Sequence, residues 1–178
     1  MDDFLLYMPT DSVEGFKGTF EVLTGLDLTV EREVVLDCGL REISFLDLRI
    51  TRSVDRVFFS VYSKPMVSVR MIHYLSRDKF QWKKATLMNY INRVVVRTSN
   101  RYLYTDLCDL EAKFRANMYP RYMVAMVFYE ALIQSSVEAK YVGVDVLRVR
   151  VSIVKGFLDR YKDLYKDLYI YMDRRQVD

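Results

Sequence analysis

The chain has 178 residues, of which 51% are hydrophobic and 29% are charged, and this composition excludes an intrinsically disordered protein. Its formal net charge of +3 excludes a basic field over the whole surface, so a nucleic-acid site requires local clustering of cations. The two cysteines and the single histidine are not spaced as zinc ligands, so we expect reduced thiols in a cytoplasmic or nuclear protein. No apolar stretch predicts a signal peptide or a membrane span, and we expect no membrane partner.

The first third of the chain predicts one helix among short strands. Strands are expected at residues 3–8, 28–35, 43–50 and 57–62. A helix is expected after Asp11 or Ser12, either of which can cap its start, and Gly25 is expected to end it. Its apolar residues at helical spacing are Val13, Phe16, Phe20 and Leu23. The turns between the strands are too short for parallel crossovers. We therefore predict a small antiparallel sheet with a packed helix.

From about Arg77 onward, apolar residues recur mostly at helical spacing. The first helical face carries Phe80, Leu87, Ile91, Val94 and Thr98. Another helix is expected to start at Pro120, and a final amphipathic stripe runs from Val142 to Leu168. We therefore predict an α+β fold in which residues 1–75 form the sheet with its helix and residues 76–178 form a mainly helical lobe.

Two adjacent carboxylates, Asp2 and Asp3, stand immediately before the apolar residues 4–7. Mg²⁺ prefers hard oxygen ligands, so this pair is a candidate for a metal site, and solvated charges at a chain end are the alternative. A site that holds two metal ions needs a further carboxylate from another strand. We therefore expect no cofactor, and Mg²⁺ only if another chain completes the site.

The candidate nucleic-acid-binding residues are basic and lie in the middle of the chain. They are Lys64, Arg70, Lys79, Lys83, Lys84, Arg93, Arg97 and Arg101. Five of them are predicted to share one helical face, about a quarter turn from the apolar face: Lys79, Lys83, Arg93, Arg97 and Arg101. Pro65 restricts the backbone at Lys64, so this turn can aim Lys64 and Arg70 at a phosphate backbone. Such cations position a nucleic acid without reading its sequence, and the alternative is the solvated face of an amphipathic helix.

Three single residues have both structural and functional interpretations. Asp47 lies between two leucines of a predicted strand and is expected to point away from them and make a structural hydrogen bond. Trp82 suits base stacking or core packing, and core packing is the favoured interpretation. His73 has no second histidine nearby in the sequence and is expected to be a packed or capping residue.

Several short motifs follow one another in an informative order. After Asp2-Asp3 come Ile43 to Leu48, Val61 to Pro65, His73 to Ser76, the Lys83-Lys84 pair, Arg93, and Asn117 to Pro120. This order resembles the back half of reverse transcriptases of the Penelope-like retroelement type, over residues 1 to about 135. The departures are Met66, Arg77-Asp78 and Met118, where the family has threonine, His-Pro and glycine.

The resemblance implies a remnant of a polymerase palm followed by a thumb-like lobe. Asp2 and Asp3 match the paired catalytic aspartates of the family, and the region of Lys64 matches its palm–thumb junction near the primer. The printed sequence has no counterpart of the fingers, the nucleotide pocket or the first metal-binding strand. Residues 140–178 match no part of the family pattern.

We therefore expect a non-catalytic protein, a truncated and domesticated remnant of a reverse transcriptase that binds RNA or DNA or serves as a scaffold. One alternative is a structural assembly protein of a virion or particle, a homo-oligomer built through its helical lobe and residues 157–178. Another alternative is a polymerase fragment that a partner chain completes. A cytoplasmic or nuclear location fits all three, and the assembly protein also fits a virion.

Overall fold

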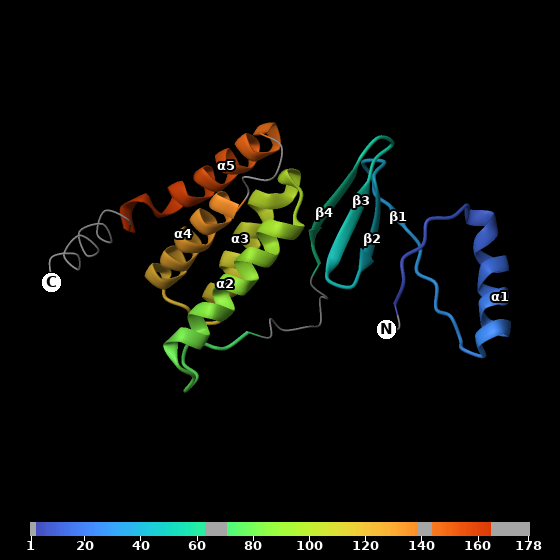
Figure 1. Ribbon diagram of the computed structural model, residues 1–178, viewed down its shortest axis with the longest axis horizontal. Coiled ribbons are helices and arrows are strands. Elements are labelled where there is room, and N and C mark those ends of the chain that lie inside the picture. Colours follow the sequence, from blue (N-terminus) through green and yellow to red (C-terminus); the bar gives the residue numbers. More distant parts are fainter. Residues whose placement is uncertain (1–2, 63–70, 139–143, 165–178) are drawn as a thin grey trace.

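The computed structural model describes residues 3–62, 71–138 and 144–164, except for the side chains of residues 133–149. It confirms the predicted α+β class, because a helix and a four-stranded antiparallel sheet precede a bundle of helices (Figure 1). The elements in chain order are η1 (Thr10–Ser12), α1 (Val13–Thr24), β1 (Val34–Val35), β2 (Arg41–Phe45), β3 (Leu48–Arg52), β4 (Val57–Val61), α2 (Phe80–Arg97), α3 (Asn100–Ala116), α4 (Arg121–Glu138), α5 (Val144–Leu158) and η3 (Asp159–Tyr161).

Helix α1 ends where the sequence predicts. Gly25 follows it with φ 68°, a left-handed conformation that glycine adopts without steric cost, and its N–H donates to the Glu21 carbonyl at 2.9 Å. The preceding residues 3–8 are not the predicted strand. Phe4 packs on the helix instead, since its ring centroid lies 6.3 Å from that of Phe16 and 5.7 Å from that of Phe20.

The sheet has the order β1-β2-β3-β4, and every neighbouring pair is antiparallel. The prediction of one strand at 43–50 is wrong, because β2 and β3 form a hairpin in which Phe45 lies opposite Leu48. Leu46 has φ 55° in the two-residue turn, a position that favours glycine or asparagine, so the sequence carries no clear turn signal there. The strand predicted at 28–35 is only Val34–Val35, and β4 confirms the strand predicted at 57–62.

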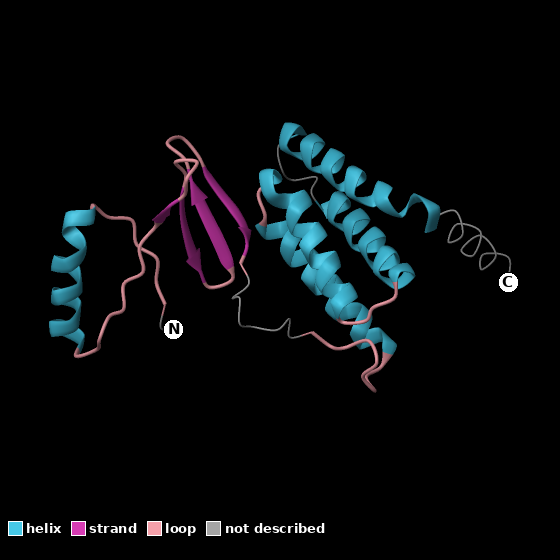
Figure 2. Cartoon of the chain, turned by 180° about the vertical axis from the view of Figure 1, so that it is seen from behind, coloured by secondary structure: helices cyan, strands magenta, loops and turns pink. Residues whose placement is uncertain are grey.

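The apolar core lies in the helical part of the chain. Among the described residues it consists of Leu87, Ile91, Val94, Val95, Leu103, Leu107, Leu110, Phe114, Tyr119, Met123, Val124, Ala125, Val127, Phe128, Ala131, Leu132, Phe157 and Tyr161. Helices α2 to α5 carry most of it and lie side by side as a bundle next to the sheet (Figure 2). Phe80 departs from the predicted apolar face of α2, because 52% of it is exposed at the start of the helix.

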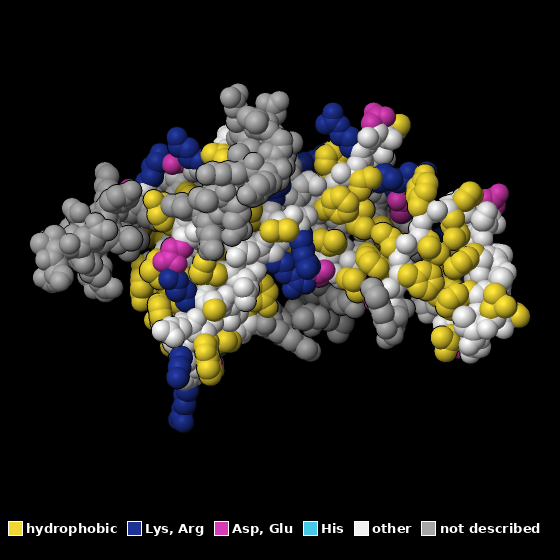
Figure 3. Space-filling view, in the orientation of Figure 1, with side chains coloured by type: hydrophobic (Ala, Val, Ile, Leu, Met, Phe, Trp, Pro, Cys, Tyr) yellow, Lys and Arg dark blue, Asp and Glu magenta, His cyan; other side chains and the backbone are white. Residues whose placement is uncertain are grey.

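The sheet has no such core. In the described residues 3–62 the buried side chains are Thr51 and Ser60, which are both polar. The strand register places Ile43, Phe45, Leu48, Ile50 and Phe59 on one side of the sheet, where the first four are half-buried and Phe59 is 38% exposed. We call these five residues the open sheet face. Val61 lies on the same side and packs against the helical core. Hydrophobic side chains cover much of the sheet and α1 in the space-filling view (Figure 3).

Strand β4 joins the sheet to the helices. The Ser99 N–H donates to the Phe59 carbonyl at 2.8 Å, and the Phe59 N–H donates to Ser99 Oγ at 2.9 Å. The Val61 N–H donates to Asp106 Oδ2 at 3.0 Å. These bonds satisfy backbone groups at what is otherwise the exposed edge of a sheet. The sheet therefore lies between α1 and the bundle in both ribbon views (Figures 1 and 2).

The described part of the C-terminal apolar stripe packs within the chain. Phe157 and Tyr161 are fully buried, and the ring centroid of Phe157 lies 4.7 Å from that of Phe128 on α4. Ile153 and Leu164 are half-buried against the same core. These four side chains are therefore occupied by contacts inside the chain, while residues 165–178 of the segment 157–178 proposed for self-association lie outside the described residues.

Candidate nucleic-acid interface

The predicted stripe of five cations is not one continuous helical face. Helix α2 ends at Arg97, Thr98 is extended with φ −92° and ψ 133°, and α3 starts at Asn100. Arg101 consequently belongs to α3 and not to the helix that carries Arg93 and Arg97. The predicted periodicity failed here because the break contains neither glycine nor proline.

Lys83 is not available for a ligand at the surface. It is buried, with 8% of the residue exposed, and its Nζ donates to the carbonyls of Tyr74 at 2.6 Å and Ser76 at 2.8 Å. The ammonium also lies 5.5 Å from the ring centroid of Tyr74. Lys83 precedes Leu87 by four residues, so both lie on the apolar side of α2. Its prediction as a nucleic-acid-binding residue is therefore corrected, since this amine ties the preceding loop to the helix.

The other predicted lysines lie apart from one another. Lys84 Nζ is 2.6 Å from Glu130 Oε2 on α4, so it is part of an ion pair within the bundle. Lys79 is exposed at the start of α2, with its Nζ 5.9 Å from the ring centroid of Trp82. Trp82 is 58% exposed, contrary to the core position that the sequence favoured. Lys64 and Arg70 lie outside the described residues.

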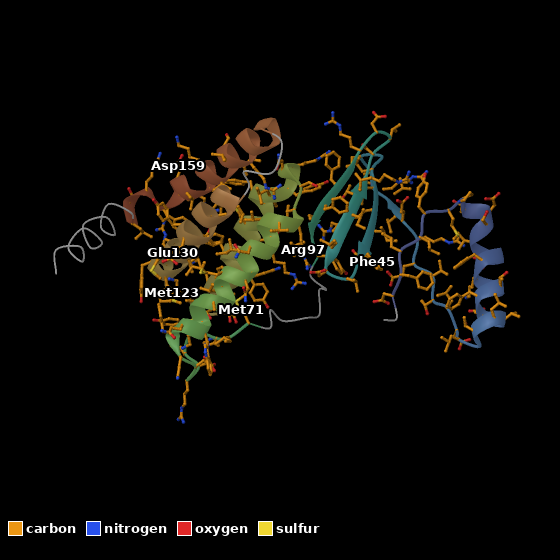
Figure 4. The ribbon with its side chains drawn as sticks, viewed as in Figure 1. Phe45, Met71, Arg97, Met123, Glu130 and Asp159 are labelled. Atoms are coloured by element: carbon orange, nitrogen blue, oxygen red, sulfur yellow. The ribbon has the colours of Figure 1, made fainter. Side chains whose placement is uncertain are left out.

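Arg93 and Arg97 meet at Asp47. Arg93 Nη2 and Arg97 Nη1 both donate to Asp47 Oδ2, which stands in the turn between β2 and β3. The Asp47 carbonyl in turn accepts the Tyr62 N–H at 2.9 Å. The structure thus confirms the hydrogen bond expected of Asp47. Arg97 points from the helices toward the sheet, and basic side chains lie beside an acidic one there in the space-filling view (Figures 3 and 4).

Two further arginines lie along the same boundary between sheet and helices. The guanidinium carbon of Arg101 lies 5.0 Å from the ring centroid of Phe58 on β4 and 5.6 Å from that of Tyr102. That of Arg49, on β3, lies 6.0 Å from the ring centroid of Tyr62, and its Nε is 3.4 Å from Glu42 Oε1. Arg49 was missed in the sequence because the hairpin register, and not a helical spacing, places it here. Arg49, Arg93, Arg97 and Arg101 are called the junction arginines below.

Asp106 adds a half-buried carboxyl to this boundary. Burial raises its pKa, while hydrogen bonds from the Val61 N–H and the Thr98 hydroxyl and the charge of Arg49 act in the opposite direction. The Thr98 hydroxyl donates to the same Oδ2 atom as the Val61 N–H, at 2.8 Å. One carboxylate oxygen therefore holds the end of β4 and the corner between α2 and α3.

The described residues provide no cluster of metal ligands around the predicted pair Asp2 and Asp3. Asp3 is exposed and Asp2 lies outside the described residues. No group of three or more histidine, cysteine, aspartate or glutamate side chains that suits a metal ion occurs among the residues that the structure describes.

Comparisons with models of protein families, with curated proteins and with solved structures give no match for this chain. No helix in the described parts of the chain has the length and apolar character needed to span a bilayer.

Proposed function

We propose that this chain is a non-catalytic nucleic-acid-binding protein that descends from the palm and thumb of a Penelope-like reverse transcriptase. The observation that carries the proposal is that each of the four junction arginines contacts a side chain at the boundary between the sheet and the helices. An arginine guanidinium forms paired hydrogen bonds with a phosphate, so a row of arginines suits a sugar–phosphate backbone. The ligand we propose is RNA or DNA held without reading of its sequence.

Local charge supports this site although the net charge of the chain is small. Arg93 and Arg97 share one carboxylate, so this group of three side chains keeps one positive charge. Arg101 has no ion pair with any described residue, and aromatic rings support its guanidinium without neutralising it. The pairs of Arg93 and Arg97 with Asp47 are partly exposed, and exposed ion pairs are easily exchanged for a ligand with more charge.

The order of elements also supports the proposed descent. A helix, a small antiparallel sheet and a helical lobe follow Asp2-Asp3 in the order that the resemblance implies. The segment around Lys64 and Pro65 connects the sheet with the helices, which is where the resemblance implies a junction of palm and thumb.

The binding proposal is tested with fluorescence anisotropy on a labelled RNA/DNA hybrid over a series of salt concentrations. Arg97→Gln removes one phosphate donor while Arg93 still holds Asp47. We expect the Kd to rise about tenfold, because a charge-assisted hydrogen bond is worth ~1.5 kcal/mol. The slope of log K against log salt should fall by about 0.7–0.9, the value for one lost phosphate contact.

Arg115→Gln is the matched control, because Arg115 is an exposed helical arginine at the far end of α3 from Arg101. It removes the same charge and should change neither the Kd nor the slope. Equal losses for Arg97→Gln and Arg115→Gln would show attraction to net charge alone, and the junction would then not be the binding site.

The open sheet face favours a second candidate function, that of an assembly protein. Two sheets pack face to face about 10 Å apart, and a two-fold axis brings identical apolar faces together. Phe59→Lys puts a charge on this face, where 38% of Phe59 is exposed. If two copies join here, light scattering should show the dimer dissociating at a concentration at least about tenfold higher than for the unaltered chain.

Val96→Lys is the control for this second candidate, because Val96 is an equally apolar position on α2 that is 80% exposed. It should leave the concentration dependence unchanged. A chain that stays monomeric at millimolar concentration rules out assembly through the open sheet face.

A further inference from the structure

The shared carboxylate at the junction stands where a phosphate oxygen is expected to bind. Arg93 and Arg97 are separated by four residues and so lie on the same side of α2, where two like charges repel each other. A single oxygen, Asp47 Oδ2, accepts hydrogen bonds from both guanidinium groups. An anion placed between them relieves the repulsion, and Asp47 supplies that anion from within the chain.

The contact is accessible to a competing ligand. The exposed fractions of the side chains are 44% for Arg93, 42% for Arg97 and 29% for Asp47. Ion pairs with this exposure gain little free energy in water. A phosphodiester carries one negative charge, as a carboxylate does, but a nucleic-acid strand presents a row of these charges to the junction arginines together. A nucleic-acid phosphate can therefore replace the carboxylate at these guanidinium groups.

The turn that carries Asp47 has a second attachment that does not involve its side chain. The Tyr62 N–H donates to the Asp47 carbonyl at 2.9 Å, and Phe45 remains paired with Leu48 across the hairpin. The carboxylate can consequently leave the arginines while the turn stays in place. This arrangement separates the electrostatic contact from the folding of the hairpin.

We propose that Asp47 is a built-in competitor for phosphate at Arg93 and Arg97, which lowers the affinity of the junction for a nucleic-acid backbone. The inference rests on the proposed function, because it concerns the regulation of the same site. A carboxylate that has been displaced stays close to the bound phosphate and repels it, so the competition persists in the complex. Removal of this charge is therefore expected to strengthen binding.

The test compares the unaltered chain with Asp47→Asn in the anisotropy assay with the same labelled RNA/DNA hybrid. We expect Asp47→Asn to lower the Kd about three- to tenfold at low salt and to steepen the salt dependence. Asp55→Asn is the matched control, since Asp55 is an exposed carboxylate in another turn of the same sheet. Asp55→Asn adds the same net charge and should leave the Kd unchanged.

Two more variants separate competition from folding. Asp47→Glu keeps the charge and should bind as weakly as the unaltered chain. The double variant Asp47→Asn with Arg97→Gln should lose most of the affinity gained by Asp47→Asn, because the effect of Asp47 is exerted through its contact with Arg97 and the two changes are not additive. Thermal unfolding followed by circular dichroism checks that each variant is folded before its affinity is compared.

The outcomes distinguish this inference from the proposed function. If Arg97→Gln weakens binding but Asp47→Asn also weakens it or leaves it unchanged, Asp47 holds the arginines in place and the competitor is overturned while the binding site stands. If Asp55→Asn strengthens binding as much as Asp47→Asn, net charge is the cause and the competitor is again overturned. If no form of the chain binds the hybrid at low salt, the proposed function fails and this inference fails with it.

Discussion

Single polar residues hold this molecule together where its two halves meet. Asp106 accepts hydrogen bonds from the Val61 N–H and the Thr98 hydroxyl on one oxygen. Within the helical part of the chain, the side chains of Lys83 and Arg150 each donate hydrogen bonds to two backbone carbonyls. Arg150 of α5 donates to the Thr98 carbonyl at 2.9 Å and to the Val95 carbonyl at the end of α2. Burial lowers the pKa of Arg150, which accords with its position inside the bundle.

Asp106 gives the stability of the protein a defined dependence on pH. Burial raises its pKa in the folded chain above the ordinary value of 3.8. The folded state therefore binds the proton more readily than the unfolded state, and the free energy of unfolding decreases as pH rises from 3.8 through the raised pKa. Asp106→Asn removes this titration and keeps an oxygen acceptor, so the decrease assigned to this carboxyl should disappear in urea unfolding measured from pH 4 upward.

Asp106→Ala is the companion variant, because it removes the acceptor as well as the charge. It leaves the Val61 N–H and the Thr98 hydroxyl without their partner, which should cost about 1–3 kcal/mol of stability at neutral pH. The pH argument would be contradicted if Asp106→Asn showed the same pH dependence of unfolding as the unaltered chain.

At the scale of elements, the sequence predicts helices better than strands. Helix α2 is long and periodic, and its residues Leu87, Ile91 and Val94 are buried as the spacing indicates. The prediction of where the strands end is wrong, because residues 43–50 have the pattern of one apolar strand and the turn at Leu46 contains no glycine. Alternation along a strand also gives little information when, as here, neither side of the sheet buries an apolar side chain completely.

The arrangement of the candidate site also depends on strand pairing that the sequence pattern does not predict. Arg93, Arg97 and Asp47 could be named from the sequence, but their meeting depends on a hairpin turn that the periodicity did not reveal. Lys83 was assigned to the wrong role because a lysine four residues before a buried leucine can turn its amine to carbonyl groups instead of water. Arg49 was missed because its position follows from the pairing of β2 with β3.

At the scale of the whole molecule, the distribution of the core divides the chain into parts of different stability. The fully buried apolar side chains among the described residues lie between Leu87 and Tyr161, whereas Thr51 and Ser60 are the buried side chains of the described residues 3–62. Amide exchange is slowest where opening requires exposure of a core. The sheet is attached to the helices by hydrogen bonds between β4 and both Ser99 and Asp106, and by the contacts of the junction arginines with the sheet.

Hydrogen exchange on the full chain should therefore separate the two parts. We expect amides of α2, α3 and α4 around Ile91, Leu107 and Phe128 to exchange only with global unfolding, because these residues are completely buried. Amides of α1 and β2 should exchange at least about a hundredfold faster, which corresponds to an opening free energy ~2.7 kcal/mol lower. Equal protection of β2 and α3 would contradict this division, since it would require the open sheet face to be covered. A rise in β2 protection with protein concentration would identify that cover as a second copy of the chain, whereas a rise only on addition of the RNA/DNA hybrid would place the ligand against the hairpin that carries Asp47.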